Sequence, residues 1–145
     1  MAKKVLIVDD DRFISEVYRL CLAKAGYDVE VAVDGQAALD RLPIFRPDAL
    51  LLDLMMPRVG GIATLKQLRS SEEFKSLPVI VSTNVFVPAM IKHAFEAGAT
   101  KVFNKATLVP PLLLASLRET VPAEAKAEKA AEYGWLWPEG SSGKA

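Results

Sequence analysis

The sequence lacks the features that mark secreted and membrane proteins. It has a single cysteine, Cys21, so no disulfide bond can form within the chain, as expected in a reducing compartment. Its apolar runs are short, and the one nearest the amino terminus, Val5–Val8, ends at an aspartate, so we expect neither a signal-peptide core nor a membrane span. These absences predict a cytoplasmic protein without a membrane partner.

The chain also lacks an excess of either charge. Lysine plus arginine and aspartate plus glutamate number 18 each, so the formal net charge is zero. Without a positive field there is nothing to gather nucleic acid, and we expect the partners to be proteins. The 145 residues, 51% of them hydrophobic and 25% charged, suit one globular domain followed by a tail.

Short apolar runs alternate with segments of helical periodicity along the first 120 residues. Because each pair of parallel strands needs a crossover connection, five such strand and helix units predict a parallel α/β sheet with helices on both faces. The expected strands are Lys3–Val8, Tyr27–Val33, Ala49–Leu52, Pro78–Thr83 and Lys101–Asn104. The expected helices cover Phe13–Leu22, Gln36–Leu42, Ile62–Arg69, Pro88–Ala97 and Leu108–Thr120.

Glycine and proline mark the expected helix ends. Gly26 and Gly98 follow the first and fourth helices, where a glycine cap is common. Pro43 is expected to stop the second helix. Pro110 and Pro111 suit only a first helical turn, so the last helix is expected to begin a residue or two late.

The composition changes after residue 120, and residues 121–145 are interpreted as a C-terminal tail. Ala123–Tyr133 is rich in alanine, glutamate and lysine and predicts a short helix, and Gly140–Ala145 predicts a mobile end. Between them lie both tryptophans, Trp135 and Trp137. These anchors suit either packing on the last helix of the domain or binding to a partner, and the sequence leaves both readings open.

Polar residues with complementary chemistry stand at the carboxyl ends of four expected strands. These ends meet at one edge of a parallel sheet, where such folds bind ligands. The residues are Asp9 and Asp10 after strand one, Asp53 at the end of strand three, Thr83 at the end of strand four and Lys105 after strand five. Three converging carboxylates repel unless a cation lies between them, and oxygen ligands favour Mg2+, with Mn2+ or Ca2+ as substitutes.

A carboxylate, a hard cation, an ammonium and a hydroxyl form the set that moves a phosphoryl group onto an acid. One of the carboxylates would be the nucleophile, the metal and the Lys105 ammonium would neutralise the transferring oxygens, and the Thr83 hydroxyl would donate to them. Each residue alone also has a plain structural reading, as a helix cap, a packed threonine or a solvated lysine. Their joint placement at four strand ends favours a site.

Four segments of the sequence together resemble the response-regulator receiver family of two-component signalling, to which the bacterial chemotaxis response regulator belongs. They are Val5–Asp11, Pro47–Pro57, Pro78–Thr83 and Ala97–Ala99 followed by Lys105. The resemblance runs from about Lys3 to about Thr120 and so implies a receiver domain over residues 1–120. It implies a flavodoxin-like, doubly wound (βα)5 fold with strand order 2-1-3-4-5.

The resemblance also implies roles for individual residues. Asp53 would accept the phosphoryl group, and Mg2+ would be held by Asp9, Asp10, Asp53 and the backbone carbonyl of Met55. Thr83 and Lys105 would stabilise the phosphorylated state.

The implied protein is a signalling switch rather than an enzyme. A sensor histidine kinase or a histidine phosphotransfer protein would donate the phosphoryl group. With no room for an effector domain, we expect a stand-alone or adaptor protein, a monomer or weak dimer, that signals by contact with a downstream protein.

The sequence departs from the family pattern at several places. Val102 occupies the usual aromatic position of strand five, and Phe103 is expected on the opposite face of that strand. Ala106 replaces the proline that usually follows the lysine, which predicts a trans peptide bond and a shifted loop. Gly60, where an acid is frequent, predicts a looser loop after Asp53, and Asn84 predicts slower access of water to a phospho-aspartate.

Three rival hypotheses remain for comparison. A haloacid-dehalogenase-type phosphatase shares the Asp9 and Asp11 spacing, but Arg12 and Phe13 do not fit its pattern. A flavodoxin-type flavin binder shares the architecture, but three acids after strand one would repel its phosphate. A scaffold with the receiver fold, whose tail binds a partner without phosphorylation, stays open.

Overall fold

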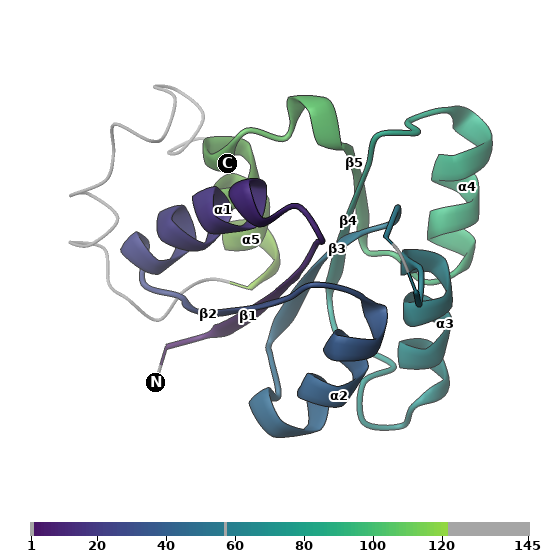
Figure 1. The fold of residues 1–145 in the computed structure, drawn as a ribbon, viewed down its shortest axis with the longest axis horizontal. Helices are drawn as coiled ribbons and strands as arrows, with labels where there is room; N and C mark the ends of the chain where they lie inside the picture. The colour runs from purple at the N-terminus through teal and green to yellow at the C-terminus, as the bar shows by residue number, and fades with distance from the viewer. Residues whose placement is uncertain (1, 57, 122–145) are drawn as a thin grey trace.

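The protein forms a five-stranded parallel sheet with helices on both faces (Figure 1). The computed structural model describes residues 2–56 and 58–121. The strands are β1 (Lys4–Val8), β2 (Asp28–Ala32), β3 (Ala49–Asp53), β4 (Val79–Thr83) and β5 (Lys101–Asn104). The helices are α1 (Arg12–Lys24), α2 (Gly35–Phe45), α3 (Gly61–Ser70), α4 (Pro88–Glu96) and α5 (Pro110–Thr120), with a 3-10 turn η1 (Lys105–Thr107) before α5. The strand order β2-β1-β3-β4-β5 confirms the predicted flavodoxin-like fold.

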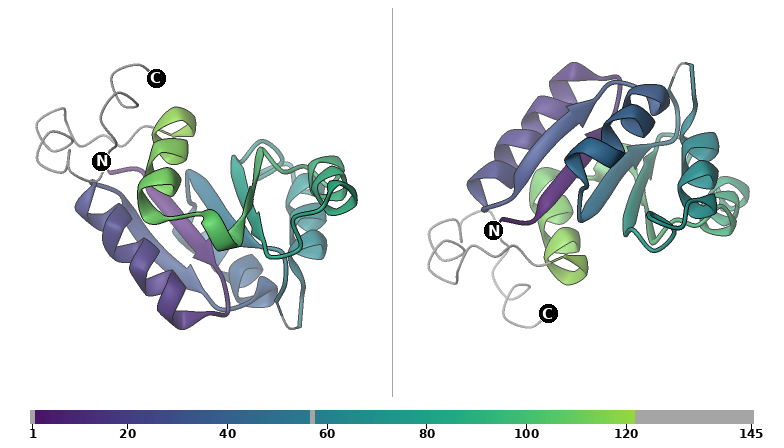
Figure 2. Two further views of the ribbon diagram at one scale, coloured as in Figure 1. Left: turned by 90° about the horizontal axis from the view of Figure 1, so that it is seen from above. Right: turned by 90° about the horizontal axis from the view of Figure 1, so that it is seen from below.

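Helices α1 and α5 cover one face of the sheet, and α2, α3 and α4 cover the other (Figure 2). Successive side chains of a strand point to opposite faces, so each central strand feeds both layers. In β1, for example, Val5 and Ile7 pack beneath α1 and α5, while Leu6 and Val8 pack on the other side. Burial on both faces explains why these strands read as continuous apolar runs.

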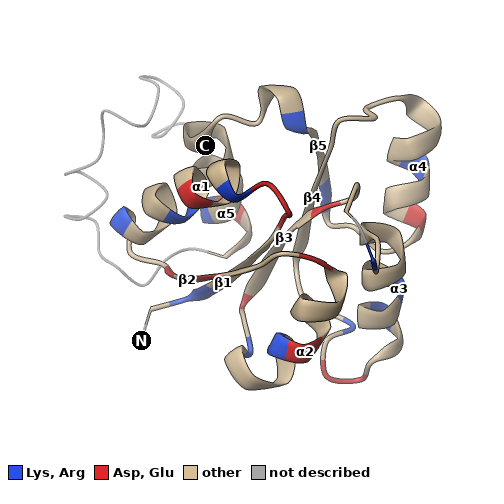
Figure 3. Ribbon diagram, in the orientation of Figure 1, with Lys and Arg blue, Asp and Glu red and all other residues tan. Residues whose placement is uncertain are grey.

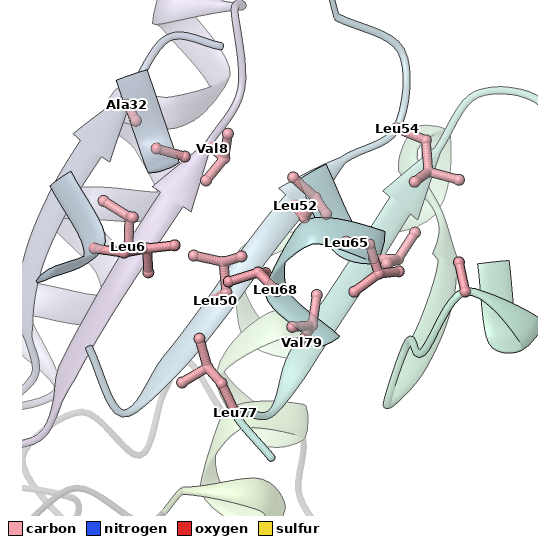
Figure 4. Close-up of a cluster of buried hydrophobic side chains, with 14 of the residues drawn as sticks. Leu6, Val8, Ala32, Leu50, Leu52, Leu54, Leu65, Leu68, Leu77 and Val79 are labelled. Carbon is pink, nitrogen blue, oxygen red and sulfur yellow. The ribbon is translucent and has the colours of Figure 1, made fainter. Parts of the chain in front are cut away.

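The two layers have separate hydrophobic clusters. The α2–α4 cluster (Figure 4) joins β1, β3 and β4 to helix α3, through residues that include Leu6, Val8, Leu50, Leu52, Leu65, Leu68, Val79 and Val81. The α1–α5 cluster includes Val5, Ile7, Tyr18, Leu22, Tyr27, Leu51, Ile80, Leu108, Leu113, Leu117 and Val121. Packing on both sides holds the three central strands rigidly, and therefore holds their carboxyl ends.

The register of the sheet aligns those ends. Val8 of β1 pairs with Leu52 of β3, so the residues after β1 lie beside the end of β3. Asp53 in turn pairs with Ser82 of β4, and Thr83 pairs with Asn104 of β5. The polar residues that follow these strands consequently gather at one edge of the sheet.

The prediction that Pro43 stops the second helix is wrong. Helix α2 continues to Phe45 with Pro43 inside its last turn, and it ends at Arg46, a left-handed residue with φ of 54°. A proline lacks the amide hydrogen and crowds the preceding turn, which favours a helix end. Here Leu42 and Phe45 are both buried in the α2–α4 cluster, and this packing outweighs the lost hydrogen bond.

The other helix ends agree with the sequence. Gly26 and Gly98 adopt positive φ angles of 103° and 115° just after α1 and α4. Pro110 and Pro111 occupy the first turn of α5. No cis peptide bond occurs within the described residues, so the bond between Lys105 and Ala106 is trans, as predicted.

Two further predictions concern membranes and the tail. Of the helices that the structure describes, none has the length and apolar character needed to cross a membrane. The predicted tail helix of Ala123–Tyr133 and the segment with Trp135 and Trp137 lie outside the described residues.

Gly35 allows α2 to approach the loop before α3, which suggests a test of the packing. A methyl group on Gly35 would lie 2.2 Å from the Thr64 hydroxyl and 2.3 Å from the backbone oxygen of Val59. Because a backbone carbonyl cannot move aside cheaply, we expect Gly35→Ala to lower the unfolding free energy by roughly 2 to 3 kcal/mol. The measurement is urea denaturation.

Gly60 provides the matched control. A methyl group there meets nothing within 4 Å, and its φ of −73° suits any residue. Since it caps α3, Gly60→Ala is expected to cost less than about 1 kcal/mol. Equal losses in the two variants would contradict the assigned packing.

Candidate functional site

The three acids that follow β1, Asp9–Asp11, have two different roles. The Asp9 carboxylate is 3% exposed and accepts a hydrogen bond from the Asp11 amide at 2.9 Å, whereas Asp10 is exposed. Asp11 is the N-cap of α1, and its side chain accepts from the Phe13 amide at 3.0 Å and from the next amide along. Asp9 and Asp10 are therefore the acids available to a ligand, and Asp11 fixes the start of α1.

Asp53 ends β3 and is 2% exposed. Its Oδ1 accepts a hydrogen bond from the Met55 amide at 3.2 Å. Asp9, Asp10 and Asp53 each offer one carboxylate oxygen, and these oxygens lie within 4.8 Å of one another. Figure 3 shows the acidic positions gathered where β1 and β3 end. The predicted convergence of three carboxylates is thus present.

Lys105 joins this cluster from the end of β5. Its Nζ lies 2.9 Å from Asp9 Oδ2 and 3.0 Å from Asp53 Oδ2, with the side chain only 11% exposed. One ammonium therefore bridges two buried carboxylates that come from separate strands. Three carboxylates face one ammonium, so the cluster keeps an excess of negative charge.

The pKa shifts at the cluster follow from burial and from these contacts. Burial raises the pKa of Asp53 above its ordinary value, and the charge of Asp9 adds to the rise, while Lys105 and the Met55 amide oppose it. Burial acts to lower the pKa of Lys105, but its bonds to Asp9 and Asp53 outweigh burial and raise it. Lys105 is consequently charged at neutral pH, whereas the ionised form of Asp53 costs folding free energy.

The donor set fits a hard divalent cation. Its atoms are carboxylate oxygens, which are the ligands that Mg2+ prefers. Asp9, Asp10 and Asp53 could hold such an ion, and its positive charge would offset the negative charge that Lys105 does not neutralise. The contact of Met55 with the site is the hydrogen bond that its amide donates to Asp53. Its carbonyl remains a predicted metal ligand.

Thr83 lies at the neighbouring strand end and is fully buried. Its hydroxyl accepts a hydrogen bond from the Val85 amide at 3.0 Å, so in this state it is engaged with the loop after β4. Its predicted interaction with a phosphoryl group remains a prediction.

One residue of the site region escaped the sequence reasoning. The side chain of Asn104 accepts from the Ala106 amide at 3.0 Å and caps η1, the turn that begins at Lys105. Asparagine side chains commonly accept a hydrogen bond from the backbone amide two residues later in a turn, so the sequence could have indicated this role of Asn104. As predicted, the two residues before Asn104 face opposite sides: Val102 packs on the α2–α4 cluster and Phe103 on the α1–α5 cluster.

Comparison with known proteins agrees with this geometry. Residues 5–117 match the response regulator receiver domain family. This chain belongs to that family. As a receiver domain of the two-component type, it is a signalling module, and the family is built around an acidic pocket that binds Mg2+.

Relatives and solved structures show how far the likeness extends. Response regulator MprA of Mycolicibacterium vanbaalenii is 40% identical over 134 residues, which cover 90% of this chain and 57% of the relative. MprA of Mycobacterium avium is 41% identical over 124 residues, or 83% of this chain and 54% of the relative. The chain thus spans a little over half the length of these relatives.

Among solved structures, chemotaxis response regulator CheY4 of Vibrio cholerae has a TM-score of 0.78 and 31% identity, covering 83% of this chain and all of that one. The BeF3-activated N-terminal receiver domain of Klebsiella pneumoniae RstA has a TM-score of 0.75 and 29% identity, covering 81% of this chain and 97% of that one. Both comparisons cover more than four-fifths of this chain.

The metal site predicts a stabilising effect of Mg2+. A bound cation relieves the repulsion among the carboxylates and stabilises the folded state by about 2.7 kcal/mol at a concentration of roughly 100 times Kd. We expect Mg2+ to raise Tm at constant ionic strength, and Asp10→Asn to abolish most of that rise. Asp48→Asn is the control, because Asp48 binds the Lys4 amide at the other end of β3. Equal Mg2+ shifts in the two variants would exclude the assigned site.

The raised pKa of Asp53 predicts a pH dependence of stability without metal. Ionised Asp53 costs folding free energy above its raised pKa, and that cost disappears as the pH falls through this pKa. We therefore expect Asp53→Asn to be more stable than the parent at neutral pH, with an advantage that shrinks on acidification. Thermal melts in metal-free buffer between about pH 4 and pH 8 measure it.

Asp34 is the opposite control. The Ala37 amide above all, and also Arg58, hold the pKa of Asp34 below its ordinary value. Its ionised form therefore stabilises the fold, so Asp34→Asn is expected to be less stable than the parent at neutral pH, with a difference that shrinks on acidification. The same trend in both variants would show that the Asp53 environment is misassigned.

Proposed function

We propose that this receiver domain accepts a phosphoryl group on Asp53 from a phosphohistidine of a sensor histidine kinase or a histidine phosphotransfer protein. The contact of Lys105 with Asp53 Oδ2 at 3.0 Å, inside a cluster of three carboxylates, carries the proposal. It joins an acceptor oxygen to a fixed positive charge where a divalent cation also fits. That combination serves phosphoryl transfer and has little use in a purely structural site.

The transfer is a substitution at phosphorus. An Asp53 carboxylate oxygen forms the new bond to phosphorus, while the bond between phosphorus and the donor histidine nitrogen breaks and that nitrogen keeps the electron pair. Lys105 neutralises charge on the phosphoryl oxygens. Mg2+, with Mn2+ as a substitute, would supply further neutralisation when held by Asp9, Asp10, Asp53 and the carbonyl of Met55.

Thr83 is the proposed sensor of the new charge. Its hydroxyl accepts a hydrogen bond from the Val85 amide. By turning toward a phosphorylated Asp53, the hydroxyl would donate its own hydrogen to a phosphoryl oxygen and give up this local bond. Release of this bond would move the loop after β4, where Val85, Phe86 and Val87 are all more than a third exposed. A change in exposed apolar residues suits signalling by contact with a downstream protein rather than with nucleic acid.

The proposed unit is a receiver domain over residues 1–120 with a tail over 121–145, acting as a cytoplasmic stand-alone or adaptor protein and as a monomer or weak dimer. Helix α5 ends at Thr120, which supports this boundary. The first residue after it, Val121, still packs in the α1–α5 cluster.

Intact-mass measurement tests the proposal. After incubation with acetyl phosphate and Mg2+, the parent protein is expected to gain the mass of one phosphoryl group, and Asp53→Asn is expected to gain none. Asp48→Asn, at the other end of β3, should behave like the parent. A parent protein that takes up no phosphoryl group from acetyl phosphate or from a phosphohistidine donor would instead favour the scaffold hypothesis.

A further inference from the structure

Tyr18 places a hydroxyl inside the α1–α5 cluster. The residue is 1% exposed, and its Oη donates a hydrogen bond to the Leu108 carbonyl oxygen at 2.7 Å. Leu108 lies three residues after Lys105, in the segment that joins β5 to α5. A tyrosine of the second turn of α1 is thus bonded directly to the loop that carries the lysine of the site.

Apart from the contacts of the Lys105 ammonium with Asp9 and Asp53, the other hydrogen bonds described for this loop are local. The Ala106 amide binds the Asn104 side chain, and the Leu108 amide reaches the Lys105 carbonyl at 3.4 Å. The Val109 amide binds the Thr107 carbonyl at 2.9 Å. Such bonds shape the turn but do not fix its place relative to the sheet, whereas the Tyr18 bond ties it to a residue 90 positions away.

Helix α1 is in turn fixed to the acidic cluster. Its N-cap Asp11 donates its amide hydrogen to Asp9 Oδ1 at 2.9 Å, and Asp9 Oδ2 is a partner of Lys105. Helix α1 therefore contacts the carboxylates at its start and the lysine loop at Tyr18. Burial, followed by the charge of Asp9, raises the pKa of Tyr18, so its hydroxyl remains a donor at neutral pH.

We infer that Tyr18 is a positioning residue for phosphoryl transfer, which holds the Lys105 loop so that the ammonium meets Asp53. The inference rests on the proposed function of Asp53. A side-chain ammonium on a four-carbon stem reaches its partner only if the backbone that carries it is held, and small misplacements of such groups slow a reaction severalfold or more. The anchor acts through Lys105 and does not itself touch the reacting atoms.

Tyr18→Phe tests the anchor because it removes the hydroxyl and keeps the buried ring. We expect the rate of Asp53 phosphorylation by acetyl phosphate at saturating Mg2+ to fall roughly fivefold. Tyr27→Phe is the matched control: Tyr27 donates to the Val121 carbonyl at 2.7 Å, in the same cluster but at the far end of α5. It should lower Tm to a similar degree and leave the rate unchanged.

A double-mutant cycle shows whether the effect passes through Lys105. In a Lys105→Met background, which has no ammonium to position, Tyr18→Phe should cause no further slowing. The same slowing in both backgrounds would overturn the inference. So would a rate of Tyr27→Phe as low as that of Tyr18→Phe, or an unchanged rate in Tyr18→Phe.

A readout without phosphoryl transfer separates this inference from the proposed function. Backbone 15N relaxation of residues 105–108 should report greater mobility in Tyr18→Phe than in the parent or in Tyr27→Phe. If the parent accepts no phosphoryl group, the proposed function fails and the positioning role fails with it, whereas the anchor is still judged by relaxation. Unchanged order in Tyr18→Phe would overturn the anchor even if Asp53 is phosphorylated normally.

Discussion

The contact of the Lys105 ammonium with Asp9 and Asp53 is the interaction on which the site depends. Two buried carboxylates from neighbouring strands repel each other, and a buried charge without a partner is costly. Lys105 meets both carboxylates at about hydrogen-bonding distance, which makes their burial tolerable. Since Asp10 adds a third negative charge, one ammonium does not neutralise the cluster. The same arrangement that offsets the repulsion between Asp9 and Asp53 therefore leaves an attraction for a divalent cation.

The sheet explains why these charges stand where they do. The central strands are buried on both faces, so a charged side chain within them would lie in one of the two apolar clusters. Only at a strand end can a polar group leave those layers. Parallel pairing then brings the ends of β1, β3, β4 and β5 to one edge, although the residues involved come from distant parts of the chain. The apolar core and the acidic site are thus consequences of one architecture.

Much of the sheet and of the acidic site could be predicted from the sequence, because strand periodicity and acids at strand ends are local signals. Asp9, Asp10, Asp53 and Lys105 could be placed together by topology alone. Pro43 could not be judged locally, since the continuation of α2 depends on the burial of Phe45 against distant residues. Tyr18 fits the apolar spacing of its helix, so nothing in the sequence indicates that its hydroxyl reaches a carbonyl 90 residues away. Packing between elements decides both cases.

The two sides of the site differ in how firmly they are held. Lys105 is tied to buried carboxylates, and its loop is tied to α1 through Tyr18, so a large displacement there would break several buried contacts at once. Thr83 is bound through one amide two residues away, next to an exposed loop. A new charge on Asp53 would therefore meet a fixed ammonium on one side and an exchangeable hydroxyl on the other. On the proposed function, the structural response begins at Thr83, because turning its hydroxyl to donate to the phosphoryl group breaks only the local bond from the Val85 amide.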